Sequence, residues 1–358
     1  MKKSALIGAI TALFIFASNP SYGADEIPEA SGIARHENKL YLVGDDSPGA
    51  YFEAPNPTPA IGAPITIVTT KVPVGKADLG IDLEAIEVLE DGRVLLLSEQ
   101  LNALLVVKDN SGTMSVTTVV EYHDQFAEVG GRGMEGLAAR KTEGNFSRIA
   151  VLWEGGYPTT EDLPRELVNA PAMCPVVFTH NLESEAPSEI RYLRLPPYNK
   201  YITLKIPDYE KMAQTKNLTY QRFRSPDLVW YLYQNPNGKK EWGFIALLGS
   251  RSLDENLEPR KMRYQYTLLQ RFTKDGFPFG EPIDIKSIVP DNLKTKNWEG
   301  MDWYDDQKKL ILVYDDNSQP TPYILDIMSE ERWPKIIAVS EPKILACHPP
   351  LRYLQLKR

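Results

Sequence analysis

The sequence predicts an all-β protein of the β-propeller class, and three observations indicate it. Short β-rich runs separated by turn residues dominate the 358 residues, without the alternation of strands and helices that a doubly wound fold needs. A phrase that opens one strand with an acidic residue and ends the next strand with another recurs along the chain. Its first copies begin about 50 residues apart, which is the length of one four-stranded propeller blade.

The predicted strands are rich in β-branched and aromatic side chains. They lie at residues 39–43, 93–97, 104–108, 115–120, 148–153, 176–179, 228–233, 243–248, 266–272 and 310–314. Turns that contain Asp-Gly or Asn-Gly separate several pairs of these runs, as at 90–92, 235–238 and 274–276. Only 162–168 and 208–214 have helical character. The pattern therefore predicts antiparallel hairpins.

The repeated phrase is clearest in three copies. They read Asp82-Leu83-Glu84-Ala85-Ile86, Met134-Glu135-Gly136-Leu137 and Trp298-Glu299-Gly300-Met301, and each leads to a strand that ends at an acid. A weaker copy at 31–33 lacks the opening acid, and another at 226–229 ends at Ser250 instead of an acid. Self-similarity of this kind is typical of a repeat architecture.

Five copies predict five blades in one domain that spans residues 25–358. Strand signals at 176–179 and 190–195 leave a sixth blade between 174 and 225 open, and a pair of packed sheets is the remaining alternative. In a closed ring, one terminus completes a blade begun by the other, with 353–356 as the candidate strand. Such closure removes exposed sheet edges.

The acids of the phrase predict a metal site. The first two strands of a blade form an antiparallel hairpin, so the start of the first and the end of the second lie at the same mouth of the channel. The expected ligands are Glu84, Glu135, Glu299, Asp45 and Asp227. Converging carboxylates repel unless a cation offsets them, and Ca²⁺, which takes six to eight oxygen ligands, is the expected cofactor. The alternative is that these acids accept backbone N–H bonds in turns and bind nothing.

Two functional hypotheses follow. As an enzyme, the protein would use the ion to polarise a phosphoryl, ester or lactone oxygen, with Glu99 or Asp315 as general base. As a binding protein, it would recognise an envelope ligand without turnover. Further candidates are His123 for proton transfer and Arg132, Tyr157 and Trp298 for contact with a small molecule at the channel mouth. The alternatives are a structural or surface role for His123, neutralisation of one of the acids by Arg132, and packing of the aromatic side chains between blades.

The N-terminal residues predict export. A basic start, an apolar run at 5–17 and small residues at 21–24 are typical of a signal peptide over residues 1–24, with a membrane anchor as the alternative. Cleavage would place the protein in the periplasm or outside the cell, where Cys174 and Cys347 either form a disulfide or remain two buried thiols.

The net charge of the chain limits the classes of partner that we expect it to bind. The formal net charge is −8, and loss of Lys2 and Lys3 with the signal peptide would make it −10. An acidic chain is a poor match for nucleic acid or an anionic membrane surface, and it suits cation binding. We expect a monomer without stable membrane insertion, whose ligand is a small molecule.

The phrases at 82–86, 133–137 and 297–301 resemble the phytase-like propellers with esterase-like activity and the SdiA-regulated propeller family. The resemblance covers most of residues 28–120, 130–180 and 225–330. It implies a five-bladed propeller with a calcium ion at the channel mouth and a hydrolytic role. Ser31 and Ser250, where acids would stand, depart from a fully symmetrical ligand ring.

Overall fold

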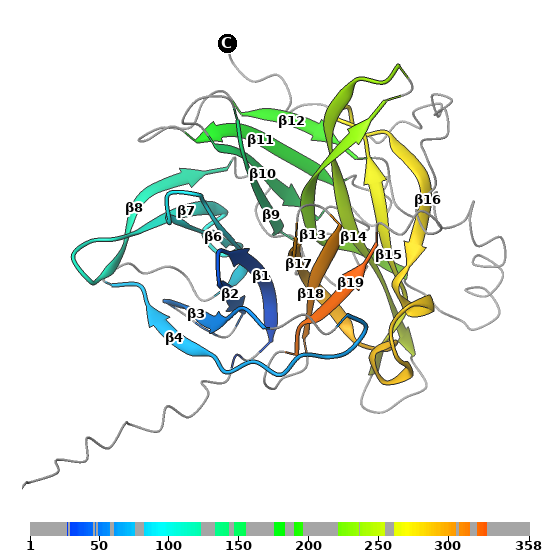
Figure 1. Ribbon diagram of the computed structural model, residues 1–358, viewed down its shortest axis with the longest axis horizontal. Helices are drawn as coiled ribbons and strands as arrows, with labels where there is room; N and C mark the ends of the chain where they lie inside the picture. Colours follow the sequence, from blue (N-terminus) through cyan, green and yellow to red (C-terminus); the bar gives the residue numbers. More distant parts are fainter. Residues whose placement is uncertain are drawn as a thin grey trace, which may run out of the picture.

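The structure is a computed structural model in which five antiparallel sheets surround a central axis (Figure 1). It describes residues 27, 29–45, 47, 49–57, 61–75, 82–122, 133–142, 147–154, 175–182, 190–195, 221–235, 237–254, 261–305, 308–315 and 321–327. The predicted signal peptide, the two cysteines, both segments of helical character and the strand at 353–356 lie outside these residues.

Each sheet is one blade, and its strands follow one another in chain order from the centre outward. The first blade contains β1 (Ala30–His36), β2 (Lys39–Gly44), β3 (Ala50–Pro55) and β4 (Thr70–Pro73). The second contains β5 (Leu83–Val88), β6 (Val94–Ser98), β7 (Ala103–Asp109) and β8 (Met114–Glu121). The third contains β9 (Met134–Lys141), β10 (Ser147–Trp153), β11 (Val176–Leu182) and β12 (Arg191–Arg194).

The two remaining blades complete the ring. The fourth contains β13 (Gln221–Gln234), β14 (Lys240–Asp254), β15 (Lys261–Phe272) and β16 (Pro278–Asp284). The fifth has three described strands, β17 (Asn297–Trp303), β18 (Lys309–Asp315) and β19 (Tyr323–Asp326). The predicted strands at 176–179 and 190–195 are the outer strands of the third blade. The prediction of five blades is therefore confirmed, and the described residues contain no sixth.

The hydrophobic core lies between the blades. Each of the five clusters of buried apolar side chains among the described residues joins two neighbouring blades. Because both faces of a blade are covered, strands such as β5 and β6 are buried along their whole length and show no alternation of polar and apolar residues. Burial on both faces explains the uninterrupted apolar run at residues 94–97 in β6.

The ring is closed by contacts between its first and last blades. The inner strands β1 and β17 pack against each other, and the segment between β3 and β4 lies along β19. There Gly62 N donates to Ile324 O at 3.3 Å and Ile65 N donates to Pro322 O at 2.9 Å. Part of the outer edge of the fifth blade is therefore covered by the first.

Helical structure in the described part of the chain is limited to the short 3₁₀ turns η2 (Ile285–Ser287) and η3 (Asp291–Leu293). No helix there is long and apolar enough to cross a membrane.

Candidate cation site at one mouth of the channel

Every inner strand carries a β-bulge at the same level of the channel. The extra residue is Ser31 in β1, Glu84 in β5, Glu135 in β9 and Glu299 in β17, and in β13 the bulge falls at 225–226. A bulge adds one residue to a strand and redirects its side chain, and it tolerates a proline such as Pro226 because the extra residue leaves the ladder. The three repeated glutamates therefore share one structural position, as the repeat predicts.

The glycine that follows two of these glutamates permits close packing of the inner strands. A Cβ on Gly300 would lie 2.9 Å from Gly32 Cα, Ile33 N and Ser31 O of the first blade. A Cβ on Gly136 would lie 2.9 Å from Asp227 Cα of the fourth blade. Backbone atoms cannot move aside as a flexible side chain can, so only glycine fits. The Glu-Gly pair thus combines a redirected acid with tight contact between blades.

The acids that end the second strands lie at the same mouth. The N–H of Asp45 donates to Glu29 O at 3.2 Å, that of Glu99 to Asp82 O at 3.0 Å, and that of Glu154 to Gly133 O at 2.9 Å. Each second strand therefore returns to the residue two positions before the bulge. The expected meeting of strand starts and strand ends at one mouth is confirmed for these three blades.

Three acids at this mouth, one at the end of a second strand and two at the start of β5, form a group suited to a cation. Carboxylate oxygens of Asp45, Asp82 and Glu84 all lie within 4.8 Å of one another. The Ser31 hydroxyl donates to Asp45 Oδ1. Sequence reasoning did not select Asp82, although the acid two positions before Glu84 was the signal that could have identified it.

Glu84 is at the centre of this group. The residue is 7% exposed, and its carboxylate accepts no hydrogen bond from any described residue. Burial raises the pKa of Glu84 well above its usual value, and the nearby carboxylates of Glu135, Asp45, Glu99 and Asp82 raise it further. Like charges gathered in a buried place are unfavourable without a cation or a bound proton.

The other predicted site residues have varied surroundings. Glu135 and Glu99 are buried beside Glu84, and Glu299 is buried and accepts a hydrogen bond from Asn297 Nδ2. Asp315 is half-buried at the end of β18, opposite Asn297. His123, Arg132 and Tyr157 lie outside the described residues.

Trp298 belongs to the core between the fourth and fifth blades. Its ring centroid lies 5.1 Å from that of Tyr314 and 6.1 Å from that of Tyr323, edge-on in both cases, and 2% of the residue is exposed. A side chain packed in this way supports the blades, and we do not place it against a ligand.

Asp227 sits one position later than the bulge and aligns with Gly136 and Gly300. Its carboxylate accepts hydrogen bonds from the N–H groups of Leu228 at 2.7 Å, Met301 at 2.7 Å and Leu137 at 3.2 Å. These donors belong to three different blades. The alternative role considered from the sequence, acceptance of backbone N–H bonds, therefore describes Asp227 and does not describe Glu84.

Two further acids that line the channel, Glu87 and Asp302, also accept backbone N–H bonds, and neither was predicted from the sequence. Glu87 accepts from Val88 N at 2.8 Å and from Ala139 N at 3.1 Å. Asp302 accepts from Trp303 N at 2.6 Å and from Arg35 N at 2.6 Å. Inner strands have no hydrogen-bonded strand on the channel side, so their buried N–H groups need other acceptors. The signal that could have identified them is their shared spacing, since Glu87 lies three residues after Glu84 and Asp302 lies three residues after Glu299.

Asp302 gives the fold a pH dependence. Burial raises the pKa of Asp302 from 3.8 to about 7. The hydrogen bonds from the N–H groups of Arg35 and Trp303, and the positive charge of Arg35, act in the opposite direction and lower it. Glu87 and Asp227 also face it, and their pKa values are raised too, first by burial. The folded state therefore holds the proton more tightly than the unfolded chain. This stabilisation is complete below about pH 4 and is lost as the pH rises through about 7.

We expect the free energy of unfolding to fall between pH 5 and pH 8, and to fall less in Asp302→Asn. Urea denaturation of both proteins at each pH unit measures the difference. Equal falls in the two proteins would contradict the assignment to Asp302, because the asparagine side chain does not titrate.

Comparison with known proteins gives one family match and several distant structural likenesses. The model of the family described as SdiA-regulated matches residues 74–150. No curated protein matches the sequence. Among solved structures, a virginiamycin B lyase from Staphylococcus aureus bound to quinupristin is similar, with 9% identity, a TM-score of 0.35 and coverage of 82% of this chain and 94% of that one.

Two other structures show a similar degree of likeness. A protein from Lactobacillus plantarum has 13% identity and a TM-score of 0.36, with coverage of 87% and 83%. A luciferin-regenerating enzyme has 8% identity and a TM-score of 0.36, with coverage of 85% and 93%. The sequence match and the five sheets together confirm the predicted resemblance to the SdiA-regulated family: this chain is a β-propeller that matches that family over residues 74–150.

Proposed function

We propose that the protein binds Ca²⁺ at the mouth of the channel formed by the bulged ends of its inner strands. The observation that carries the proposal is Glu84, a buried carboxylate with four other carboxylates around it and no hydrogen-bond donor among the described residues. A bound divalent cation offsets this repulsion, and an acid cluster that only capped backbone groups would resemble Asp227 instead.

The donors fit calcium. Ca²⁺ prefers hard oxygen ligands at about 2.4 Å, so oxygens that share one ion lie within about 4.8 Å of one another. Asp45, Asp82 and Glu84 meet that limit. We assign these three as the first ligands, with Glu99 and Glu135 beside them and Glu299 as a further acid of the same mouth.

Glu84→Gln tests the proposal because its effect on stability should reverse with calcium. Without calcium, the variant should be more stable than the original protein, since one buried charge among like charges is gone. With calcium at 100 times its dissociation constant, the original protein should gain about 2.7 kcal/mol, and the variant should gain little.

The measurement is thermal unfolding of chelator-stripped protein with and without Ca²⁺. Glu37→Gln, an exposed change in the turn between β1 and β2, is the control and should respond to calcium as the original protein does. An equal calcium response in Glu84→Gln and the original protein would overturn the site.

A hydrolytic role would use the same mouth. Glu99 lies beside Glu84, and its carboxylate occupies the space that a Cβ on Gly133 would take. In this role, Glu99 would accept a proton from water, and a bound ion would supply a Lewis acid for an ester, lactone or phosphoryl oxygen.

Assays on these three substrate classes, with calcium or with chelator, separate hydrolysis from ligand binding. Calcium-dependent turnover that Glu135→Gln abolishes would establish the enzyme. Absence of turnover in calcium-loaded protein would leave a binding propeller.

The cellular setting belongs to the same proposal. Residues 1–24 have the pattern of a signal peptide, so we place the mature protein in the periplasm or outside the cell. Mass spectrometry of protein recovered from cell fractions tests this, because cleavage would leave a chain that starts near Asp25.

A further inference from the structure

A cavity lies at the other mouth of the channel, where the inner strands turn into the second strands. Its volume is about 750 Å³, within the range of small-molecule sites. All five blades contribute to its lining, through residues such as Arg35, Glu87, Arg140, Tyr231 and Trp303. It is separated from the acidic mouth by the length of the inner strands, and the proposed calcium site does not use it.

An aromatic wall forms one side of this cavity. Trp303 Nε1 donates to Trp230 O at 2.7 Å, which fixes the orientation of the indole. The ring stacks on Tyr231 with centroids 6.4 Å apart and planes 28° apart, and it remains partly exposed. A fixed, partly exposed indole provides a surface on which a flat apolar ring can lie.

Cations outnumber the available acids around the cavity. Lys141 is paired with Glu90, and Asp305 is paired with Lys309 at 2.9 Å. Arg35, Arg140, Lys240 and Lys308 also line the cavity, and the described residues supply no ion pair for any of them. An excess of positive charge in an acidic protein, gathered from four blades, favours an anion at this mouth.

Arg140 is held in a fixed position. Its guanidinium lies 4.8 Å from the ring centroid of Trp230 and 4.7 Å from that of Trp242. Burial lowers its pKa to about 10, so it stays charged at neutral pH. A cation fixed between two indoles contributes charge to the cavity at little entropic cost.

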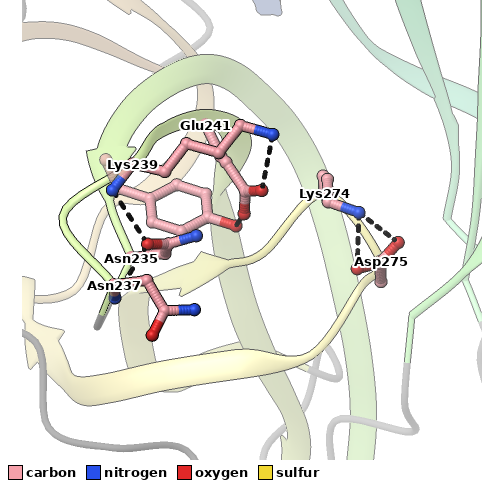
Figure 2. A network of polar contacts seen from close by, with 7 residues as sticks. Asn235, Asn237, Lys239, Glu241, Lys274 and Asp275 are labelled. Carbon is pink, nitrogen blue, oxygen red and sulfur yellow. Dashed lines mark hydrogen bonds and ion pairs between the residues drawn. The ribbon is translucent and has the colours of Figure 1, made fainter.

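The β13–β14 turn places Lys240 at the rim. Asn235 Oδ1 accepts from the N–H groups of Asn237 and Lys239, each at 3.0 Å, which fixes the turn (Figure 2). Figure 2 also shows that Lys239 and Lys274 have acidic partners, Glu241 at 3.9 Å and Asp275 at 3.1 Å. Lys240 follows the turn as an exposed cation that faces the cavity.

Glu87 and Asp302 also line the cavity, and each already accepts two backbone N–H bonds. Because the pKa values of both are raised, they oppose an anion less than ordinary carboxylates would. Their free lone pairs can accept a hydrogen bond from a polar group of a ligand.

We infer that this second mouth binds a small anionic molecule with a flat apolar ring, the ring lying on Trp303 and the acidic group lying among Arg35, Lys240 and Lys308. The ring and the charge are separate requirements, so they can be tested with separate probes. Neither depends on calcium.

Calorimetric titration of the full mature chain in chelator provides the test. Indole-3-acetate carries both ring and anion, tryptamine carries the ring with a cation, indole carries the ring alone, and acetate carries the anion alone. We expect indole-3-acetate to bind more tightly than the other three. The double variant Lys240→Gln/Lys308→Gln should weaken that binding by about tenfold, because both exposed side chains act through charge.

Lys274→Gln is the matched control, since this lysine is not among the residues that line the cavity and already has an acidic partner. It should leave the affinity unchanged, as should Glu84→Gln at the acidic mouth. The inference is overturned if indole-3-acetate gives no binding heat, if tryptamine binds as tightly, or if the double variant binds like the original protein. A failure of this test leaves the calcium proposal intact, because the two mouths are probed by different ligands.

Discussion

Gly300→Ala is expected to lower the free energy of unfolding by about 3 kcal/mol, the upper part of the range for overpacking a close-packed interface. The added Cβ would lie 2.9 Å from three backbone atoms of the first blade. Relief requires the first and fifth blades to separate, and this is the junction at which the ring closes. Urea denaturation with a matched control measures the loss.

Gly75→Ala is that control. Its Cβ would meet Thr113 Cγ2, a methyl group, at 3.2 Å and Met114 O at 3.5 Å. We expect Gly75→Ala to lower the free energy of unfolding by less than about 1 kcal/mol, since a methyl group can shift slightly. Similar losses in the two variants would show that contact between inner strands is not what requires glycine in the Glu-Gly phrase.

Asp227→Asn is expected to destabilise the protein by up to about 3 kcal/mol, although the change is isosteric. The carboxylate accepts N–H groups from three blades, and an amide offers one acceptor oxygen and turns an NH₂ group toward the remaining donors. Buried N–H groups left without an acceptor cost about 1–3 kcal/mol each. Thermal and urea unfolding both measure this.

The same variant separates structural acids from ligands. Because Asp227 is occupied by backbone donors, we expect Asp227→Asn to keep most of its affinity for calcium while it loses stability. Asp91→Asn, an exposed change in the β5–β6 turn, is the control and should change stability by less than about 0.5 kcal/mol. Loss of calcium binding in a folded Asp227→Asn protein would return Asp227 to the ligand set predicted from the sequence.

The blade count and most strands could be predicted from the sequence because a repeated local phrase encodes them. Glu84, Glu135 and Glu299 each follow an apolar residue and precede a small one, and each turned out to be the extra residue of a bulge. The antiparallel course of the first two strands of a blade then sufficed to place Glu99 and Asp45 at the same mouth. These inferences need only local periodicity and the antiparallel pairing of neighbouring strands.

The register of the fourth blade could not be predicted in the same way. Pro226-Asp227 looks like another opening phrase, yet the bulge falls before Asp227 and shifts it by one position. Which acids accept backbone N–H groups depends on contacts between blades, such as that of Asp302 with Arg35. The cavity at the second mouth is lined by residues from 35 to 308, and no local pattern brings them together.

The most direct test of the calcium site is calorimetric titration of Ca²⁺ into mature, chelator-stripped protein, with Glu84→Gln/Glu135→Gln as the comparison. We expect saturable binding to the original protein and its loss in the double variant, which should remain folded because it removes two like charges. Absence of binding to the original protein, or equal binding to both proteins, would contradict the assignment of the acidic mouth as a calcium site.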